Sequence, residues 1–389
     1  MKKVVLISSV LLTFVIGVYF YYYSDSQKYV LENASSYQKV ISSNSLTMMY
    51  ETDYQSGEYQ VSSDNAWPQD GYVFNETLSK CENGGILTWD DENKKVLLQT
   101  NISDKCFVYF DKEPGTLASY IINNVYTGTD GDNGLYYHDG VGSYTNADQE
   151  AGDYSYRYSG ASEDVNNYVC FGSKGVTCSE ENLYRIIGVF NNQVKLIKAT
   201  SYGDYVWDVD DNTWNEATKP DIYTTLNTTY WNNIDLLWKE LIDTDYNWHV
   251  GGFSFSGVNT ANDTYNAEIR DNEGYIETMP IGLMYLSDYS YASMPSVWVT
   301  SPFDLYYPIR SNWLFAYITE WTLSRSISNA SLTYVIDNPG YSTGSGVYQG
   351  YATTYKGDWN FSIRPCFYLN SDVQYISGSG TQTDPYRID

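Results

Sequence analysis

The strongest hydrophobic pattern in the chain is an uninterrupted run of 20 apolar, small or aromatic residues from Val4 to Tyr23, preceded by Lys2 and Lys3. A helix of about 20 residues extends about 30 Å, which matches the hydrocarbon core of a bilayer. The run predicts a single transmembrane anchor over residues 1–25, and the positive-inside rule places the rest of the chain outside the cell. A cleaved signal peptide is the alternative, although bulky tyrosines stand where small residues are expected.

Two regions with different patterns follow this run. Residues 26–45 are polar and rich in Ser and Asn, which predicts a stalk. Residues 46–112 contain short β-prone runs separated by turn signals, and the segment from Ile86 to Thr100 has the pattern of a hairpin. We therefore expect residues 46–112 to form a small all-β sandwich.

Residues 115–389 mix helical and strand patterns, so we expect an α+β domain there. Helical spacing predicts helices from Thr116 to Val125 and from Trp231 to Leu241. The segment from Leu183 to Ala199 predicts two apolar strands that turn at Asn191-Asn192. Further strands are predicted at 280–302, Trp313 to Leu323, Ser331 to Ile336 and Ser362 to Leu369.

Composition and charge restrict the function classes. Tyrosine accounts for 42 of the 389 residues, and the net charge is −26. Tyrosine suits both half-buried strands and polar recognition surfaces, because its ring buries a large area while its hydroxyl stays polar. The negative charge repels phosphate backbones, so nucleic acid is excluded as a partner.

The five cysteines are typical of an oxidising, extracellular environment. The most economical pairing joins Cys81 to Cys106 and Cys170 to Cys178, because each pair brackets one compact segment. Cys366 then has no partner within the chain. The sequence thus predicts one disulfide in each of the two domains.

Calcium is the cofactor for which the sequence offers ligands. Asp130 and Asp132, in the segment D-G-D-N-G, and Asp208 and Asp210, in D-V-D-D-N, place carboxylates at alternate positions. Calcium takes about six to eight oxygen ligands, which such clusters can supply, but neither segment completes an EF-hand loop. Solvated turns rich in Asp and Asn are the alternative.

Three tryptophans, Trp207, Trp214 and Trp231, lie in polar, loop-like segments where a role in the core is not evident. Exposed aromatic rings stack on sugar rings, so these residues are the candidate binding residues. No G-x-S-x-G motif surrounds a serine, and the two histidines, His138 and His249, are far apart. The sequence therefore offers no recognisable nucleophile-and-base set.

The C-terminal part contains E-W-T-L-S-R at Glu320 to Arg325 and, further on, I-R-P-C-F-Y-L at Ile363 to Leu369. These two elements resemble the closing half of C-type-lectin-like domains, in particular the formylglycine-generating-enzyme-like branch and related bacterial surface domains. The resemblance implies that Trp321 fills the core between two small sheets, and that Arg325 and Arg364 tie loops together through charge-assisted hydrogen bonds. Such enzymes need two cysteines late in the domain, whereas this chain has only Cys366, so oxidase activity is not expected.

Together with the anchor and the segment C-E-N-G-G, the chain also resembles uncharacterised membrane-anchored surface proteins of Gram-positive-type bacteria. We expect a cell-surface binding or adhesion protein that recognises a glycan or another protein through the lectin-like domain. The second hypothesis is a structural component of an envelope assembly that has no soluble ligand. The third is a glycan-active enzyme, for which Glu268, Glu273, Glu277 and Glu320 are candidate carboxylates.

Overall fold

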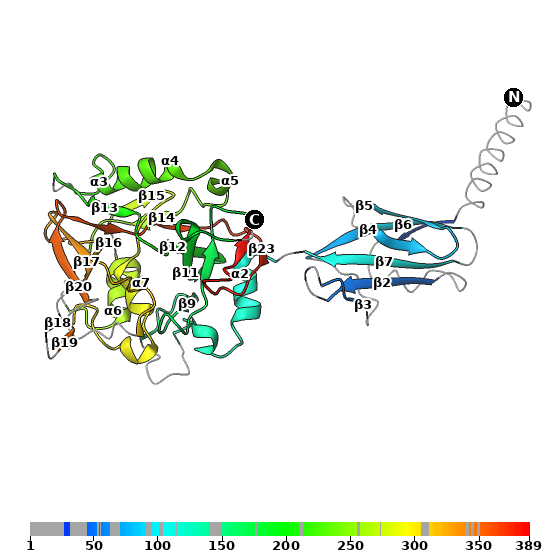
Figure 1. Ribbon diagram of the computed structural model, residues 1–389, viewed down its shortest axis with the longest axis horizontal. Helices are drawn as coiled ribbons and strands as arrows, with labels where there is room; N and C mark the ends of the chain where they lie inside the picture. Colours follow the sequence, from blue (N-terminus) through cyan, green and yellow to red (C-terminus); the bar gives the residue numbers. More distant parts are fainter. Residues whose placement is uncertain are drawn as a thin grey trace, which may run out of the picture. The chain divides into compact units, whose positions relative to one another are not determined.

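The computed structural model describes residues 27–31, 45–52, 54, 56–62, 71–90, 95–100, 104–113, 115–140, 149–175, 177–210, 213–254, 257–272, 274–304, 311–338, 342–343, 346–347 and 351–389. The chain divides into two compact units, Met1–Pro114 and Gly115–Asp389, called here the N-terminal unit and the C-terminal unit (Figure 1). Within the described ranges, no helix is both long and apolar enough to span a membrane. The anchor predicted at 1–25 lies outside these ranges, as does Glu273.

The N-terminal unit consists of two sheets. In the four-stranded sheet, β2 (Ser45–Glu51) and β7 (Lys105–Lys112) run parallel, flanked by antiparallel β3 (Tyr59–Val61) and β4 (Tyr72–Cys81). The second sheet has the order β1 (Gln27–Leu31), β6 (Lys95–Thr100), β5 (Ile86–Asp90), with antiparallel pairing throughout. The hairpin predicted between Ile86 and Thr100 is confirmed by the β5–β6 pair.

The two sheets share one hydrophobic core, because apolar residues alternate along their strands and point to the same side. The buried residues are Leu46 and Met48 of β2, Cys106, Val108 and Phe110 of β7, and Val96 and Leu98 of β6. The prediction of a polar stalk over 26–45 is wrong for residues 27–31. They include the β-prone sequence Y-V-L and form the edge strand β1 instead.

The disulfide Cys81–Cys106 is confirmed. The two residues lie directly opposite each other on β4 and β7, with their Cα atoms 4.0 Å apart. The bond therefore joins neighbouring strands of one sheet, and does not cross between the two sheets as a staple through the core would.

The C-terminal unit contains two larger sheets. The first has the order β22 (Cys366–Tyr368), β12 (Gln193–Lys198), β11 (Leu183–Phe190), β9 (Tyr156–Tyr158), β8 (Leu135–Tyr137), and β10 (Tyr168–Cys170) also pairs with β11. The second has the order β13 (Gly203–Val206), β21 (Asn360–Ile363), β16 (Glu320–Arg325), β17 (Leu332–Asp337), β20 (Tyr351–Lys356). Three two-stranded ribbons complete the strands: β14 (Asn247–His249) with β15 (Ile276–Thr278), β18 (Ser342–Thr343) with β19 (Gly346–Val347), and β23 (Tyr375–Ser377) with β24 (Arg387–Ile388).

The helices of this unit are short (Figure 1). They are α2 (Leu117–Tyr120) continued by η2 (Ile121–Val125), η3 (Asp132–Gly134), η5 (Glu180–Asn182), α3 (Asp221–Thr224) continued by η6 (Thr225–Tyr230) and α4 (Trp231–Asn233), α5 (Leu236–Lys239), α6 (Ala261–Tyr265) continued by η7 (Asn266–Arg270), α7 (Leu286–Tyr291) and η8 (Pro295–Val297). The helix predicted from Thr116 to Val125 is confirmed, and the Thr116 hydroxyl caps it by accepting from the Ser119 backbone N–H.

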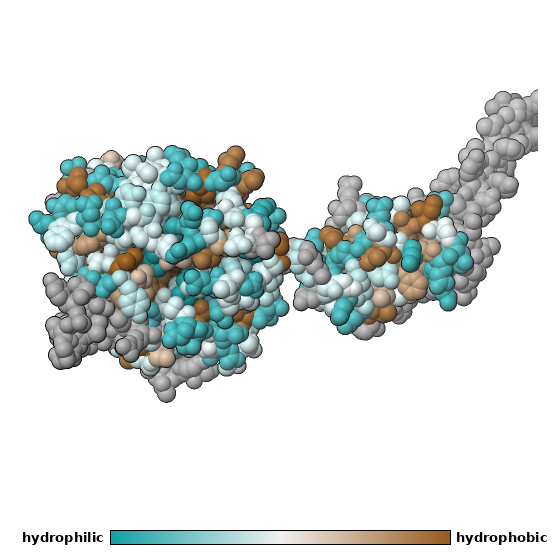
Figure 2. Space-filling view, in the orientation of Figure 1, coloured by the Kyte–Doolittle hydropathy of each residue, from teal (hydrophilic) through white to brown (hydrophobic). Residues whose placement is uncertain are grey.

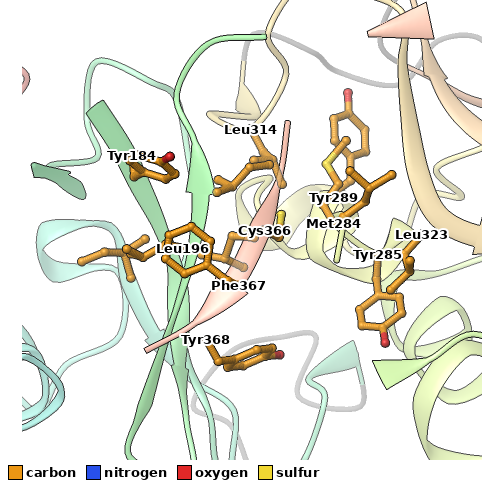
Figure 3. Packing of buried hydrophobic residues seen from close by; sticks show 14 of the residues in the cluster. Tyr184, Leu196, Met284, Tyr285, Tyr289, Leu314, Leu323, Cys366, Phe367 and Tyr368 are labelled. Atoms are coloured by element: carbon orange, nitrogen blue, oxygen red, sulfur yellow. The ribbon is translucent and has the colours of Figure 1, made fainter. Parts of the chain in front are cut away.

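The hairpin predicted from Leu183 to Ala199 is confirmed by the β11–β12 pair, which lies at the centre of the first sheet. Asn191 and Asn192 adopt left-handed backbone conformations with φ of 49° and 64°, which asparagine tolerates and a tight two-residue hairpin turn requires. Both strands are buried along almost their whole length, and their outer edges pair with other strands: β9 and β10 pair with β11, and β22 pairs with β12. Figure 3 shows Leu196 of β12 and Phe367 of β22 packed in this core.

Two predicted elements differ from the structure. The predicted helix from Trp231 to Leu241 is interrupted at Ile234, because Asp235 caps a new helix by accepting from the Leu237 backbone N–H. The block predicted as strands at 280–302 contains the fully buried helix α7. Glu268 from a distant segment accepts the backbone N–H groups of Leu286 and Ser287, which supplies the N-terminal acceptors that this helix needs.

Candidate functional site

The tryptophans predicted to bind sugars are mostly core residues. Trp207 and Trp214 are each 1% exposed and pack edge to face, with ring centroids 5.8 Å apart. Their indole N–H groups donate to the Thr322 carbonyl and to Glu277. The expectation that these two rings lie exposed in loops is wrong, because segments far away in the sequence cover them. Trp231 is half-buried, with the Lys239 ammonium 5.2 Å from its ring centroid.

The aspartates predicted to bind calcium do not converge. Asp130 accepts from the Tyr126 hydroxyl and the Tyr137 backbone N–H, and Asp132 accepts from the Thr127 hydroxyl. Asp208 is buried, whereas Asp210 is exposed. Across the described part of the chain, the only close group of three potential metal ligands is Cys81, Asp104 and Cys106, and its two cysteines form a disulfide.

The resemblance assigns structural roles to Trp321, Arg325 and Arg364, and all three residues are buried. The Trp321 indole donates to the Tyr205 carbonyl, and Arg364 forms a bidentate ion pair with Glu320 at 2.6 and 2.7 Å. Arg325 differs from the expectation, because its buried Nε and Nη1 atoms have no hydrogen-bond partner among the described residues. The disulfide Cys170–Cys178 is confirmed, and Cys366 is a buried free thiol.

A cavity lined by four charged side chains lies in the C-terminal unit where β9, β12, β14 and α7 meet, and we call it the Lys195 pocket. Lys195 lies on the buried strand β12 and is 1% exposed. Its ammonium is 2.5 Å from Asp288 Oδ2. The rings of Tyr285, Trp248 and Tyr368 surround it, with centroids 4.7, 5.2 and 5.4 Å from Nζ. Cation–π attraction and one ion pair thus hold a charge that burial alone would expel.

Asp288 is positioned by the helix to which it belongs. It lies in the first turn of α7, and its Oδ2 also accepts the backbone N–H of Tyr285, the residue that precedes the helix. Figure 3 shows Tyr285 and Tyr368 as members of the core that contains Leu196 and Phe367. The helix cap and the ion pair therefore share one carboxylate, which fixes its orientation.

A second buried cation, Arg157 of β9, extends the charge cluster. Its Nη2 is 2.5 Å from Asp153, its Nε donates to Ser155, and its Nη1 is 4.0 Å from Asp288. Burial opposes the charged forms, but mutual attraction prevails: it raises the pKa of Arg157 and lowers the pKa of Asp153 to about 2. Two cations and two carboxylates make the cluster electrically neutral.

The pocket above this cluster encloses about 180 Å³. Its aromatic walls come from Phe190, Tyr246, Tyr265, Tyr285 and Tyr368, and Tyr246 stacks on Tyr368 with centroids 3.6 Å apart. Its further polar groups come from Asn191, Asn247, His249 and Ser287. Aromatic walls with a few convergent polar groups are typical of small-molecule binding sites.

His249 contributes an unsatisfied polar atom to this pocket. Its backbone N–H donates to the Tyr285 hydroxyl, whereas its buried Nδ1 has no hydrogen-bond partner among the described residues. Burial lowers the pKa of His249, so the imidazole is neutral at physiological pH. A buried polar atom without a partner costs free energy.

Two ionisable groups in this part of the unit are unsuited to particular catalytic roles. Asp153 is held ionised by its low pKa, which makes it a poor proton donor. Cys366 does not line the pocket, and burial raises the pKa of its thiol, so it is not a reactive nucleophile. What the pocket offers is rigid donors, carboxylate acceptors and tyrosine rings.

The sequence contained one signal for this site that the prediction did not use. Lys195 stands within the apolar sequence V-K-L-I of a strand predicted to be core. A lysine at such a position must either be exposed or find a buried partner. Its partner Asp288 is 93 positions away, so the sequence alone could not identify it.

Comparisons of the chain with protein-family models, with curated proteins and with solved structures gave no match. The function is therefore argued from the geometry of the C-terminal unit.

Proposed function

We propose that this chain is a cell-surface binding protein, and that its C-terminal unit binds one ring of an uncharged saccharide in the Lys195 pocket. The observation that carries the proposal is a neutral ion cluster, buried except for part of Asp153, at the base of an open pocket with tyrosine walls. Buried ion pairs contribute little net stability compared with apolar residues of similar size. A binding role gives a reason for a cluster that stability alone does not require.

The chemistry of the pocket corresponds to that of a sugar ring. Sugars present an apolar face to aromatic rings, and hydroxyl groups that both donate and accept hydrogen bonds at their edges. Lys195 and Arg157 offer donors, whereas Asp153 and Asp288 offer acceptors. Because these charges sum to zero, the pocket has no excess charge with which to select an ionic ligand.

The size of the pocket favours a single ring. Its volume of about 180 Å³ lies below the roughly 300–1,000 Å³ that is typical of sites for drug-sized ligands. A longer glycan would therefore place one residue in the pocket and the others on the surface.

In this proposal the C-terminal unit is a C-type-lectin-like domain, displayed outside the cell by the N-terminal anchor. The buried Trp321 and the Arg364–Glu320 ion pair support the fold assignment, because the resemblance implied structural roles for this tryptophan and this arginine. The two disulfides support an oxidising compartment.

The test is binding of the purified full-length chain, in detergent, to a panel of neutral glycans and cell-wall polysaccharides, with calcium and then with chelator. The informative variant is Asn191→Gly, which removes an amide from the pocket while keeping a residue that tolerates positive φ. Asn192→Gly is the matched control, because Asn192 has the same backbone conformation and does not line the pocket.

Loss of one hydrogen bond of about 1 kcal/mol would weaken binding about fivefold in Asn191→Gly and leave it unchanged in Asn192→Gly. Equal affinities in the two variants would contradict the proposed site. Absence of binding to every neutral glycan would instead favour the structural envelope role.

A further inference from the structure

A second buried cation site lies on the neighbouring strand, away from the Lys195 pocket. Arg185 belongs to β11 and is 5% exposed. Its guanidinium lies between two aromatic rings, with its Cζ atom 4.5 Å from the Tyr168 centroid and 4.6 Å from the Trp313 centroid. The two rings hold the planar group in one orientation.

Within the described ranges, the hydrogen bonds of Arg185 all go to neutral acceptors. Nε donates to Asn167 Oδ1 at 2.6 Å, and Nη1 donates to the Ser162 hydroxyl at 2.8 Å and to the Trp313 carbonyl at 3.3 Å. Nη2 donates to the Val165 carbonyl at 3.2 Å. A guanidinium has five N–H groups, so these four bonds leave one N–H of Nη2 for another acceptor.

Three buried cations of the unit are paired with carboxylates, whereas Arg185, like Lys198 and Arg325, forms no ion pair with the described residues. Arg157 pairs with Asp153, Lys195 with Asp288 and Arg364 with Glu320. Among the described residues, no carboxylate lies within ion-pair distance of Arg185. Burial and the nearby charge of Arg364 lower the pKa of Arg185 to about 10, which still leaves it protonated at neutral pH. The site therefore holds a buried positive charge without a counter-ion.

This charge opens onto a cavity of about 250 Å³, which we call the Arg185 pocket. Phe315 and Tyr317 contribute aromatic surface, and Tyr317 is 61% exposed. The other charged groups that line it are Arg364, already paired with Glu320, and Glu163, which is exposed. A pocket with a positive charge at its floor and aromatic side chains at its rim is exceptional in a chain whose net charge is −26.

We propose that the Arg185 pocket binds the carboxylate group of a small organic acid or of an acidic sugar residue. The carboxylate would take the remaining N–H of Arg185 and supply the counter-ion that the fold lacks, while the attached ring or chain lies against Phe315 and Tyr317. The site is separate from the proposed saccharide pocket, and the two share no lining residue.

The test is calorimetric titration of the full-length chain with glucuronate, benzoate and acetate, each beside a neutral counterpart: glucose, benzyl alcohol and ethanol. Binding of glucuronate alone would identify an acidic sugar, and binding of benzoate alone an aromatic acid. Binding of all three would identify a site that recognises the carboxylate itself. Each of these results supports the proposal, whereas failure of all three carboxylates, or equal binding of acid and neutral counterpart, overturns it.

Two sets of variants locate the site. Arg185→Gln should weaken carboxylate binding at least tenfold, because a charge-assisted hydrogen bond is lost. Glu163→Gln should tighten it about twofold by removing a repelling charge from the rim, whereas Glu216→Gln, an equal charge change on an exposed residue outside the pocket, should not.

The Glu163 and Glu216 pair decides the outcome if Arg185→Gln fails to fold. Equal affinities in these two variants would overturn the proposal. Asn191→Gly should leave carboxylate binding unchanged, which separates this site from the Lys195 pocket.

Discussion

Arg185 and Lys195 lie on neighbouring strands of one sheet, and both are almost completely buried, yet their surroundings differ in one respect. Lys195 has a carboxylate partner at 2.5 Å within a neutral cluster, whereas Arg185 has only neutral acceptors. The first arrangement satisfies its charge internally and suits an uncharged ligand. The second leaves a charge that a ligand can neutralise. The difference indicates that the charge of a buried cation's partner, more than the burial of the cation, determines whether the pocket binds a charged or an uncharged ligand.

The largest effect is expected from a variant in which Lys195, like Arg185, has no carboxylate partner. Asp288→Asn removes the nearest counter-ion and leaves a buried ammonium unpaired, so we expect a loss of about 3–5 kcal/mol in the free energy of unfolding. Urea unfolding of the full-length chain measures this loss.

The double variant Lys195→Met and Asp288→Leu is the control for that loss. Replacing both charges by apolar residues is often neutral, so the double variant should recover most of the stability. A loss below about 1 kcal/mol in Asp288→Asn would contradict the view that this carboxylate balances the buried charge.

Glu268 is the acidic counterpart of Arg185, because neutral donors surround it: two backbone N–H groups and the Ser324 hydroxyl. Burial raises its pKa from 4.5 to about 7, although these hydrogen bonds oppose the shift. The folded state therefore binds the proton more tightly than the unfolded state. The contribution of Glu268 to the free energy of unfolding is fully present below about pH 4.5. It decreases by on the order of 3 kcal/mol as the pH rises to about 7.

The measurement is urea unfolding at pH 5 and pH 8 of the wild type and of Glu268→Gln. The variant should lack the part of the decrease that Glu268 contributes, whereas Glu150, whose pKa burial also raises to about 7, contributes equally in both proteins. The difference between the two proteins is the quantity to compare, because burial lowers the pKa of His138 to about 3 and gives an opposite slope between about pH 3 and 6.5. Identical pH dependence in the two proteins would contradict the assignment to Glu268.

The smallest effect is expected from a variant in which Arg185, like Lys195, has a carboxylate partner. The Ser162 hydroxyl accepts from Arg185 Nη1 and its residue is exposed, so Ser162→Asp brings a carboxylate to the guanidinium from the surface. We expect a stabilisation of about 0.5–1 kcal/mol and at least fivefold weaker carboxylate binding, because the pocket then holds its own counter-ion. Ser162→Asn is the neutral control. Unchanged carboxylate binding in Ser162→Asp would show that the ligand binds elsewhere.

Local sequence signals predicted the local parts of the fold. The β11–β12 hairpin follows from two apolar runs around Asn191-Asn192, and both disulfides follow from the spacing of cysteines in compact segments. The helix that begins after Thr116 follows from a capping residue before a periodic apolar pattern. In each case the residues that determine the structure are close together in the chain.

Tertiary contacts explain the failures. Helix α7 was predicted as strand because the acceptors from Glu268 that begin it come from another segment. Trp207 and Trp214 were expected at the surface because the Thr322 and Glu277 groups that receive their indole N–H groups are 115 and 63 positions away. The Lys195 pocket is assembled from several segments in the same way, so no single segment of the sequence could predict it.

The most direct test of the central claim is a crystal structure of the full-length chain in complex with the neutral glycan that binds best in the panel. The account predicts one sugar ring in the Lys195 pocket, stacked on a tyrosine ring, with hydroxyls in hydrogen-bond contact with the Lys195–Asp288 pair or with His249 Nδ1. A glycan bound elsewhere, with the Lys195 pocket unchanged, would contradict the account.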